Sequence, residues 1–375
     1  MERCVLQKLI VFLRRETVLS IAWLLAAATA FLVPPDRAYL DYIDGGTLGL
    51  LFSLMAVMAG LQGLGLFRRL GEHLLERTAT TRQLEGALIF LPFFFSMAVT
   101  NDVALITFVP FAMEVLELAG EEERLIPVVA MQTIAANLGS MATPIGNPQN
   151  LYLYSHYQMS LGEFFRSMLP LTAASGLLIL LFLLCRRSTP LSLPKLTPPA
   201  ISEGRRLGFY LILFVLCLAA VAKALPVALL CVLVALLTAL VDRRVLVRVD
   251  WSLLATFVGF FLFVGNLSRL PACHDFFQAV LAHHEAVCAV LASQALSNVP
   301  AALLLSGFTD NGTALLVGTN LGGLGTLIAS MASLISYKQV VRRSPHKKGK
   351  YLLWFTAANL VFLTILLGGY LLLAV

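Results

Sequence analysis

Short polar sequences interrupt two long apolar stretches of this chain of 375 residues. Thr-Asn-Asp at residues 100–102 breaks the apolar stretch 84–118, and Ser-Asn at residues 297–298 breaks the stretch 281–308. Polar side chains within apolar sequence usually face a cavity or a polar partner. Their hydroxyl, amide and carboxylate oxygens are hard ligands that suit Na⁺ or a small anion better than a soft metal. The carboxylate of Asp102 can also carry a proton.

Two further segments combine Asn and Thr with several Gly and Pro residues. Residues 125–155 contain NLGSMATPIGNPQN, and residues 312–337 contain NLGGLGTLIASMAS. Gly and Pro leave backbone groups unpaired there, so each segment is predicted to be a helix with an unwound middle. Half-helices of this kind point positive N-terminal ends at an anion, and their freed carbonyl groups coordinate a cation. The candidate substrate and ion ligands are therefore Thr100, Asn101, Asp102, Asn137, Gly139, Thr143, Asn147, Ser297, Asn298, Asn320, Gly322 and Thr326.

The composition indicates that these segments lie in a membrane. Apolar residues make up 59% of the chain and charged residues only 13%, against about 25% charged residues in a soluble domain. So few charges could not cover a water-soluble surface. The net charge of +6 is typical of basic cytoplasmic loops, so no nucleic-acid partner is expected.

The elements that position the polar residues follow from segment length, because a membrane-spanning helix needs about 20 apolar residues, with about 17 as the lower limit. Seven segments meet this requirement and are predicted to cross once: 17–35, 45–67, 163–185, 207–223, 225–241, 251–268 and 351–374. Charged loops are predicted at 68–83, 186–206 and 242–250. A lone polar residue in such a span, Asn266, is better explained by a hydrogen bond to a neighbouring helix than by a binding site.

The two stretches with polar interruptions do not fit single or double crossings. Two crossings and a turn need about 40 residues, and both 84–118 and 281–308 are shorter. Each is predicted to be a re-entrant hairpin, which is tolerated where protein or a water-filled cavity covers its backbone. The segments 125–155 and 312–337 are long enough to cross once as discontinuous helices.

An internal repeat relates the two halves of the chain. Residues 137–151 and 320–334 share 6 identities in 15 ungapped positions, and Thr100-Asn101 matches Ser297-Asn298 in the same order. Transporter folds are often built from such duplications. The sequence therefore predicts an all-α polytopic membrane protein that is built as a repeat.

The basic residues predict the orientation of the repeat. With the N-terminus in the cytoplasm and both hairpins non-crossing, 23 of the 27 Lys and Arg residues fall on cytoplasmic segments, as expected from the positive-inside rule. This arrangement has nine crossings, inverted halves and an external C-terminus. The predicted parts are a cytoplasmic interfacial segment 1–16, a first repeat 17–185, a cytoplasmic linker 186–206, and an extra helix plus the second inverted repeat at 207–375.

Four sequences carry a resemblance to a known superfamily: VTNDVALITFVPF, ANLGSMATPIGNPQNL, LSNVPAALLL and NLGGLGTLIASMASLISYK. They resemble the ion transporter superfamily, which includes divalent anion/sodium symporters, citrate-transporter-like permeases, arsenite efflux permeases and one family of sodium/proton antiporters. The resemblance covers nearly the whole chain from about residue 17 onward. It implies secondary transport, with an elevator motion and a homodimer in many members.

The resemblance also implies roles for individual residues. In the divalent anion symporters, Ser-Asn-Thr sequences at the two hairpin tips help to bind Na⁺ and substrate carboxylates. Here Asp102 and Val299 replace the final hydroxyl residue; the Asn-Asp pair is similar to that of arsenite permeases and weakens the dicarboxylate interpretation. The Na⁺ ligands that the resemblance implies are Thr100, Asn101, Asn137, Ser297, Asn298 and Asn320.

The sequence therefore predicts a secondary active transporter that moves a small anion, a carboxylate or an inorganic oxyanion, by alternating access. Na⁺ or H⁺ is the expected coupling ion, no other cofactor is expected, and the expected location is the lipid bilayer of a bacterial-type inner membrane. The alternatives are a sodium/proton antiporter, an arsenite efflux permease and a passive anion channel. No enzyme activity is expected, because Asp102 lacks the second carboxylate or the Ser–His pair that hydrolysis requires.

Overall fold

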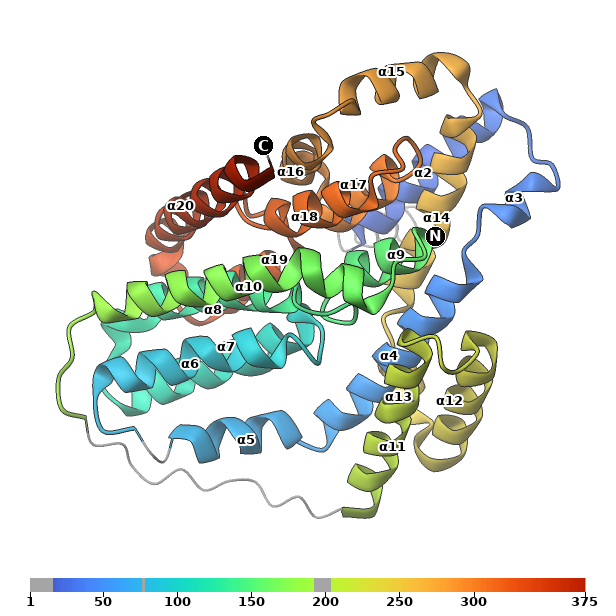
Figure 1. Cartoon of the computed structure of the whole chain (residues 1–375). Helices are drawn as coiled ribbons and strands as arrows, with labels where there is room; N and C mark the ends of the chain where they lie inside the picture. The colour runs from blue at the N-terminus through green and yellow to red at the C-terminus, as the bar shows by residue number, and fades with distance from the viewer. Residues whose placement is uncertain (1–15, 76–77, 192–203, 375) are drawn as a thin grey trace, which may run out of the picture.

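The computed structural model describes residues 16–75, 78–191 and 204–374, and these residues are mainly helical (Figure 1). They contain no strand, only an isolated bridge between Thr80 and Pro190. Residues 1–15 of the predicted interfacial segment and residues 192–203 of the predicted linker lie outside the described residues. The fold class is therefore all-α over the described part of the chain.

Each of the seven predicted single spans corresponds to one apolar helix. These are α2 (Thr17–Leu32), α4 (Gly45–Gly63), α10 (Leu161–Leu184), α11 (Gly204–Val221), α12 (Val227–Asp242), α14 (Trp251–Ser268) and α20 (Lys348–Ala374). Among the described helices, α4, α10, α11, α14 and α20 are long and apolar enough to cross a bilayer. Helices α2 and α12 are apolar but have only 16 residues each, so the count of nine crossings stays a prediction.

Two of the predicted charged loops are partly helical, and the loop prediction was wrong there. Helix α5 (Leu66–Leu75) occupies much of the first loop, and α13 (Arg244–Arg248) occupies part of the third. In α5 the buried residues Phe67, Gly71 and Leu75 recur every four residues, so one face packs. Arg68 and Arg69 stay exposed, and Glu72 is buried and pairs with Arg68. The chain turns between α4 and α5 at Gly65, whose φ is +69°, so the predicted span 45–67 ends early.

The interrupted segments form pairs of helices joined by breaks. The pairs at the predicted hairpins are α6 (Thr81–Phe95) with α7 (Asn101–Leu118), and α16 (Glu285–Leu296) with α17 (Asn298–Leu305). The predicted discontinuous helices are α8 (Leu125–Ser140) with α9 (Pro148–His156), and α18 (Gly312–Gly322) with α19 (Met331–Arg343). The remaining short elements are α3 (Ala38–Asp41), α15 (Pro271–Leu281) and 3₁₀ turns at Glu122–Arg124 and Pro345–Lys347. The re-entrant depth of the hairpins stays a prediction.

The helices form two groups, and each half of the chain contributes helices to both of them. In one group α2 packs against α14, and α4 packs against α11 and α12; in the other, α6 packs against α8, α16 against α18, and α20 against α8. We call these the framework group (α2, α4, α11–α14) and the hairpin group (α6–α10, α16–α20). Helices α5 and α15 connect the groups at opposite ends of the molecule (Figure 1). The contacts recur in equivalent pairs, as expected of a duplicated unit.

A buried ion-pair cluster fixes the base of the first hairpin. Glu85 on α6 has a side chain only 1% exposed and accepts hydrogen bonds from Arg124 at 2.9 Å and from Arg186 at 2.8 and 3.0 Å. Arg186 follows α10, and the chain after it hydrogen-bonds to the start of α6 through Thr189 and Thr81. Removing one partner of such a pair would leave a buried charge uncompensated, so this cluster ties α6 to the start of α8 and the end of α10.

Candidate substrate and ion site

The first discontinuous helix is interrupted where its sequence is richest in Gly and Pro. Helix α8 ends at Ser140, and α9 begins at Pro148 with Asn147 as its N-cap. The Asn147 Oδ1 accepts a hydrogen bond from the backbone N–H of Asn150 at 2.9 Å. Pro148 suits the first helical position because proline has no N–H and an N–H there would lack a partner within the helix. The local sequence therefore ends one half-helix and starts another.

The second discontinuous helix has an equivalent break. Helix α18 ends at Gly322, and α19 begins at Met331 after Ser330. Gly325 in this break has φ of +107°, which only glycine adopts readily. The predicted interruptions at 137–147 and 320–326 thus correspond to helix breaks, although α8 continues through Asn137 and Gly139 before it ends.

The two breaks lie in contact and bind each other reciprocally. Asn147 Nδ2 donates to Asn320 Oδ1 at 3.1 Å, and Ser330 Oγ donates to Asn137 Oδ1 at 3.1 Å. Ser330 occupies the repeat position equivalent to Asn147, and Asn320 the position equivalent to Asn137. Each second half-helix therefore starts with a residue that contacts the NLG sequence of the other repeat.

The hairpin tips bind the same breaks through their backbone. The N–H of Asn101 donates to the carbonyl of Gly146 at 3.0 Å, and the N–H of Asn298 donates to the carbonyl of Ala329 at 2.9 Å. Asn101 Nδ2 also donates to Asn137 Oδ1 at 3.0 Å. The two tips thus meet through the discontinuous helices, which brings together residues that sequence analysis placed in one site.

The predicted threonines bind the hairpin backbone. Thr143 Oγ1 donates to the carbonyl of Met97, and Thr326 Oγ1 donates to the carbonyl of Gln294 at 3.2 Å. Met97 and Gln294 are themselves at equivalent places just before the two tips. These hydroxyls therefore hold the tips against the breaks.

The predicted glycines allow helices to pack closely. A Cβ on Gly139 would lie 2.0 Å from the carbonyl oxygen of Phe93, and a Cβ on Gly322 would lie 2.6 Å from Ser293 Oγ. Only glycine lets α8 approach α6, and α18 approach α16, so closely. The structure gives both residues a packing role beside the site.

The second tip has an unusual backbone conformation. Ser297 alone separates α16 from α17, and its φ is +81°. Residues other than glycine rarely adopt a positive φ, and those that do tend to cluster at functional sites. Ser297 Oγ and the amide of Asn298 face the break of α18 and α19 near Ala329.

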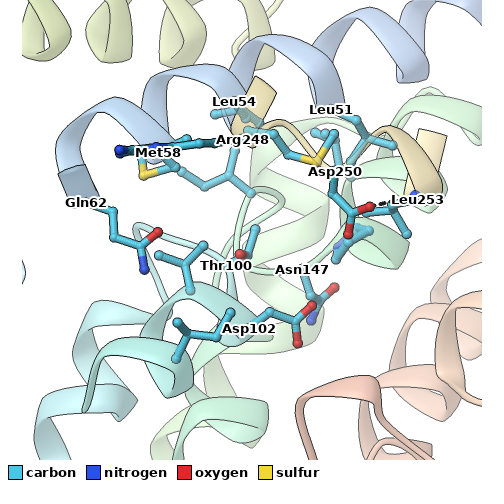
Figure 2. Close-up of a pocket in the computed structure, with 17 residues that line it drawn as sticks. Leu51, Leu54, Met58, Gln62, Thr100, Asp102, Asn147, Arg248, Asp250 and Leu253 are labelled. Atoms are coloured by element: carbon cyan, nitrogen blue, oxygen red, sulfur yellow. Dashed lines mark hydrogen bonds between the residues drawn. The ribbon is translucent and has the colours of Figure 1, made fainter. Parts of the chain in front are cut away.

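A cavity of about 350 Å³ lies between the hairpin group and the framework group (Figure 2). Thr100, Asp102 and Asn147 line it from the hairpin group, together with the starts of α7 and α9. Helix α4 contributes an apolar wall that ends at Gln62, and the chain from α13 into α14 contributes Arg248, Asp250 and Leu253. Of the predicted ligands, only these three line the cavity; the others lie in the hydrogen-bonded breaks and tips.

The charges around the cavity are unevenly paired. Asp102 Oδ1 is buried and has no hydrogen-bond partner among the described residues. Asp250 caps α14 by accepting from the N–H of Leu253 at 2.9 Å. A buried carboxylate oxygen without a donor is costly, so the position favours a proton or a cation.

Sequence analysis missed several residues that complete the site. Asn150 accepts from Asn320 Nδ2 at 2.6 Å, and Gln294 bonds the carbonyls of Gly322 and Leu324 at 2.9 Å each. Asn150 was visible as the last residue of the GNPQN sequence. Arg248 and Asp250 gave no signal, because they lie in a charged stretch that is more simply a solvated loop.

Comparison with known proteins identifies the family to which the chain belongs. A family model described as citrate transporter matches residues 5–311. The chain belongs to the citrate transporter family. Members of this family are membrane transporters and not enzymes, so the cavity between the groups lies in an integral membrane transport protein.

Relatives of this family member occur in bacteria, archaea and plants. The chain is 32% identical over 362 residues to the inner membrane protein YbiR of Escherichia coli (strain K12), covering 92% of this chain and 94% of the relative. It is 31% identical over 298 residues to the uncharacterized transporter MJ0456 of Methanocaldococcus jannaschii, covering 79% and 81%. It is 34% identical over 176 residues to the silicon efflux transporter LSI3 of Oryza sativa subsp. japonica, covering 47% and 36%.

Proposed function

We propose that this family member is a secondary active transporter that moves a small anion or weak oxyacid by alternating access, coupled to H⁺ or Na⁺. The observation that carries the proposal is the unpartnered, buried Asp102 oxygen in a cavity between two helix groups. Such a carboxylate can exchange a proton or a cation as the cavity changes its access. Alternating access follows if the hairpin group moves against the framework group.

The ends of two helices support anion binding beside Asp102. Thr100 is the N-cap of α7, Asn147 is the N-cap of α9, and both line the cavity. Helix N-termini carry a partial positive charge, which favours an anion nearby. An anion there would lie next to the coupling group, which is the arrangement that ion-coupled transport requires.

The cavity supports a small substrate of low charge. About 350 Å³ is near the lower limit of ligand pockets. Asp102 and Asp250 both line it, and each would repel a multiply charged carboxylate. We therefore favour a monovalent oxyanion or a weak oxyacid over a di- or tricarboxylate.

A second candidate function is exchange. In one form, as in an arsenite permease, the protein exports a weak oxyacid in exchange for H⁺ or Na⁺. In the other form it is a sodium/proton antiporter and moves no oxyacid. The carboxylate at position 102 favours it, since the equivalent Val299 offers no polar group. The relative named as a silicon efflux transporter supports the oxyacid form of this candidate.

The membrane arrangement is also proposed. Both hairpins enter the bilayer and return, nine segments cross, the N-terminus lies in the cytoplasm and the C-terminus outside. The distribution of Lys and Arg supports this orientation. The protein would reside in a bacterial-type inner membrane, as a homodimer, with Na⁺ ligands among the residues of the tips and breaks.

Transport by proteoliposomes tests the proposal. Purified protein should accumulate arsenite, silicic acid or phosphate against its gradient when a pH or Na⁺ gradient is imposed, and Asp102→Asn should abolish this accumulation. Equilibration without accumulation would indicate a passive channel. Na⁺-driven proton flux without any of these substrates would indicate an antiporter. An Asp102→Asn variant with unchanged uptake and pH dependence would refute the coupling role.

A further inference from the structure

The framework side of the cavity carries the charge opposite to Asp102. Arg248 is the basic residue among those that line the cavity, and it comes from the end of α13. No described residue forms a hydrogen bond or ion pair with its guanidinium, although Tyr210 lies within electrostatic range. Figure 2 shows Arg248 beside α4 and Asp102 on the opposite wall. Two unlike charges therefore line one cavity from different helix groups, and neither is paired.

We propose that Arg248 determines specificity by binding a negatively charged oxygen of the substrate in this conformation. This inference rests on the proposed function, because it takes the cavity as the substrate site. An anion in the cavity meets Asp102 and Asp250, so its charge needs a counter-charge from the lining. Arg248 supplies it, with the planar, multiply donating group that suits oxyanions.

The position of Arg248 depends on a glycine in α4. A Cβ on Gly63 would lie 2.6 Å from Arg248 Nη1, so the guanidinium rests directly against the C-terminal end of α4. The bare backbone of Gly63 thus leaves room for the charge at the edge of the cavity. Replacing Gly63 by alanine would displace the guanidinium without changing any charge.

A neighbouring cavity offers one competing cation. Lys338 lines a cavity of about 260 Å³ that shares Asp250 and Leu253 with the first. Glu16 also lines this smaller cavity and Asp102 does not, so Lys338 shares its cavity with two carboxylates other than Asp102. The structure therefore assigns the anion contact to Arg248 and makes Lys338 a comparison.

Phosphate binding to the purified full-length protein tests the assignment, with thermal unfolding measured in phosphate against chloride at equal ionic strength. Phosphate should stabilise the wild type, and Arg248→Gln should raise its dissociation constant about tenfold or more, the loss expected for a charged hydrogen bond. Arg248→Lys should lose less, because the charge stays while the planar fork is lost. Arg244→Gln, which removes the same charge from the same short helix outside the cavity lining, should bind phosphate as the wild type does.

Two further variants keep the test decisive if Arg248→Gln folds poorly. Gly63→Ala should weaken phosphate binding, and Asp102→Asn should strengthen it by removing a repelling carboxylate. Absence of phosphate stabilisation in the wild type, equal binding by Arg248→Gln, or a loss in Lys338→Gln but not in Arg248→Gln would overturn the inference. Phosphate binding through Arg248 without ion-driven transport would refute the proposed function alone.

Discussion

Asn147 is the residue whose replacement tests most directly whether the two helix breaks hold the repeats together. Its Oδ1 caps α9 by accepting from Asn150 N–H at 2.9 Å, and its Nδ2 donates to Ser140 Oγ at 3.2 Å and to Asn320 Oδ1 at 3.1 Å. Asn147→Ala removes all three bonds. Asn147→Ser keeps a capping hydroxyl, and serine already stands at the equivalent position of the other repeat, where Ser330 donates to Asn137.

The expected cost of each change follows from these bonds. Losing an N-cap costs about 1 kcal/mol. Leaving the Asn320 oxygen, in a residue only 3% exposed, without its donor costs about 1–3 kcal/mol. Asn147→Ala should therefore lower the free energy of unfolding by about 2–4 kcal/mol. Asn147→Ser should lower it by about 1–3 kcal/mol, since the hydroxyl retains the cap but the Asn320 oxygen still loses its donor.

Thermal unfolding of the purified variants, ranked by apparent midpoint, measures this order. Asn320→Ala and the double variant with Asn147→Ala complete a cycle in which the combined loss should be smaller than the sum, because the two residues share a bond. Asn266→Ala is the control: Asn266 bonds Thr29 of α2 and Tyr39 of α3, away from the hairpin group, so its effect should add to that of Asn147→Ala. Equal midpoints for Asn147→Ala and Asn147→Ser, or strict additivity of the first pair, would refute the reasoning.

Four other predictions each follow from one local feature of the structure. Asp102→Asn should abolish ion-driven accumulation in proteoliposomes while keeping or raising the unfolding midpoint, because it removes an unpartnered buried charge; a lowered midpoint would indicate a hidden partner. Ser297→Gly should be at least as stable as the wild type and more stable than Ser297→Ala, since φ of +81° favours glycine; thermal unfolding of both variants decides. Gly139→Ala should unfold at a clearly lower temperature or fail to express, because its Cβ would lie 2.0 Å from the Phe93 carbonyl oxygen; a wild-type midpoint would contradict this packing. Glu85→Gln should cost about 3 kcal/mol, since it breaks a buried pair with two arginines, and thermal unfolding at high salt should not remove the difference.

Much of the helical framework was predictable because apolar length is a strong signal in a membrane protein. The segments 163–185 and 251–268 differ from α10 and α14 by at most two residues at either end. Amphipathic elements were harder to predict. Helix α5 carries Arg68, Arg69 and Glu72, so its sequence is typical of a loop until the buried face is known.

The interrupted segments were predictable because Gly, Pro and Asn have direct backbone consequences. Their partners were not, since a hydrogen bond between Asn147 and Asn320 depends on how two distant segments cross. The same limit explains why Gly139 was predicted to open the backbone. The sequence alone cannot distinguish a glycine that unwinds a helix from one that admits a neighbouring helix.

The framework contribution to the site could not be predicted at all. Arg248 and Asp250 lie outside the matched sequences of the internal repeat, and nothing in their local sequence indicates a cavity. Their importance follows only from the packing of α13 and α14 against α4, which places both residues at the cavity that Asp102 also lines. Charged residues in a connecting segment become candidates once a cavity is seen to reach them.

Duplication yields equivalent contacts, and transport needs a difference between the two halves. The reciprocal bonds of the breaks are nearly interchangeable. The tips, in contrast, differ in charge, because Asp102 of the first tip corresponds to Val299 of the second. The framework differs too. Asp44 is the N-cap of α4, as Asp250 is of α14. Asp44 lines another cavity, of about 500 Å³, whose lining contains no arginine. If the coupling ion binds a carboxylate, this asymmetry predicts one such site per chain, at the first tip. Val299→Asp should then add a second titrating group and change the number of coupling ions moved per substrate, which flux ratios in proteoliposomes can measure.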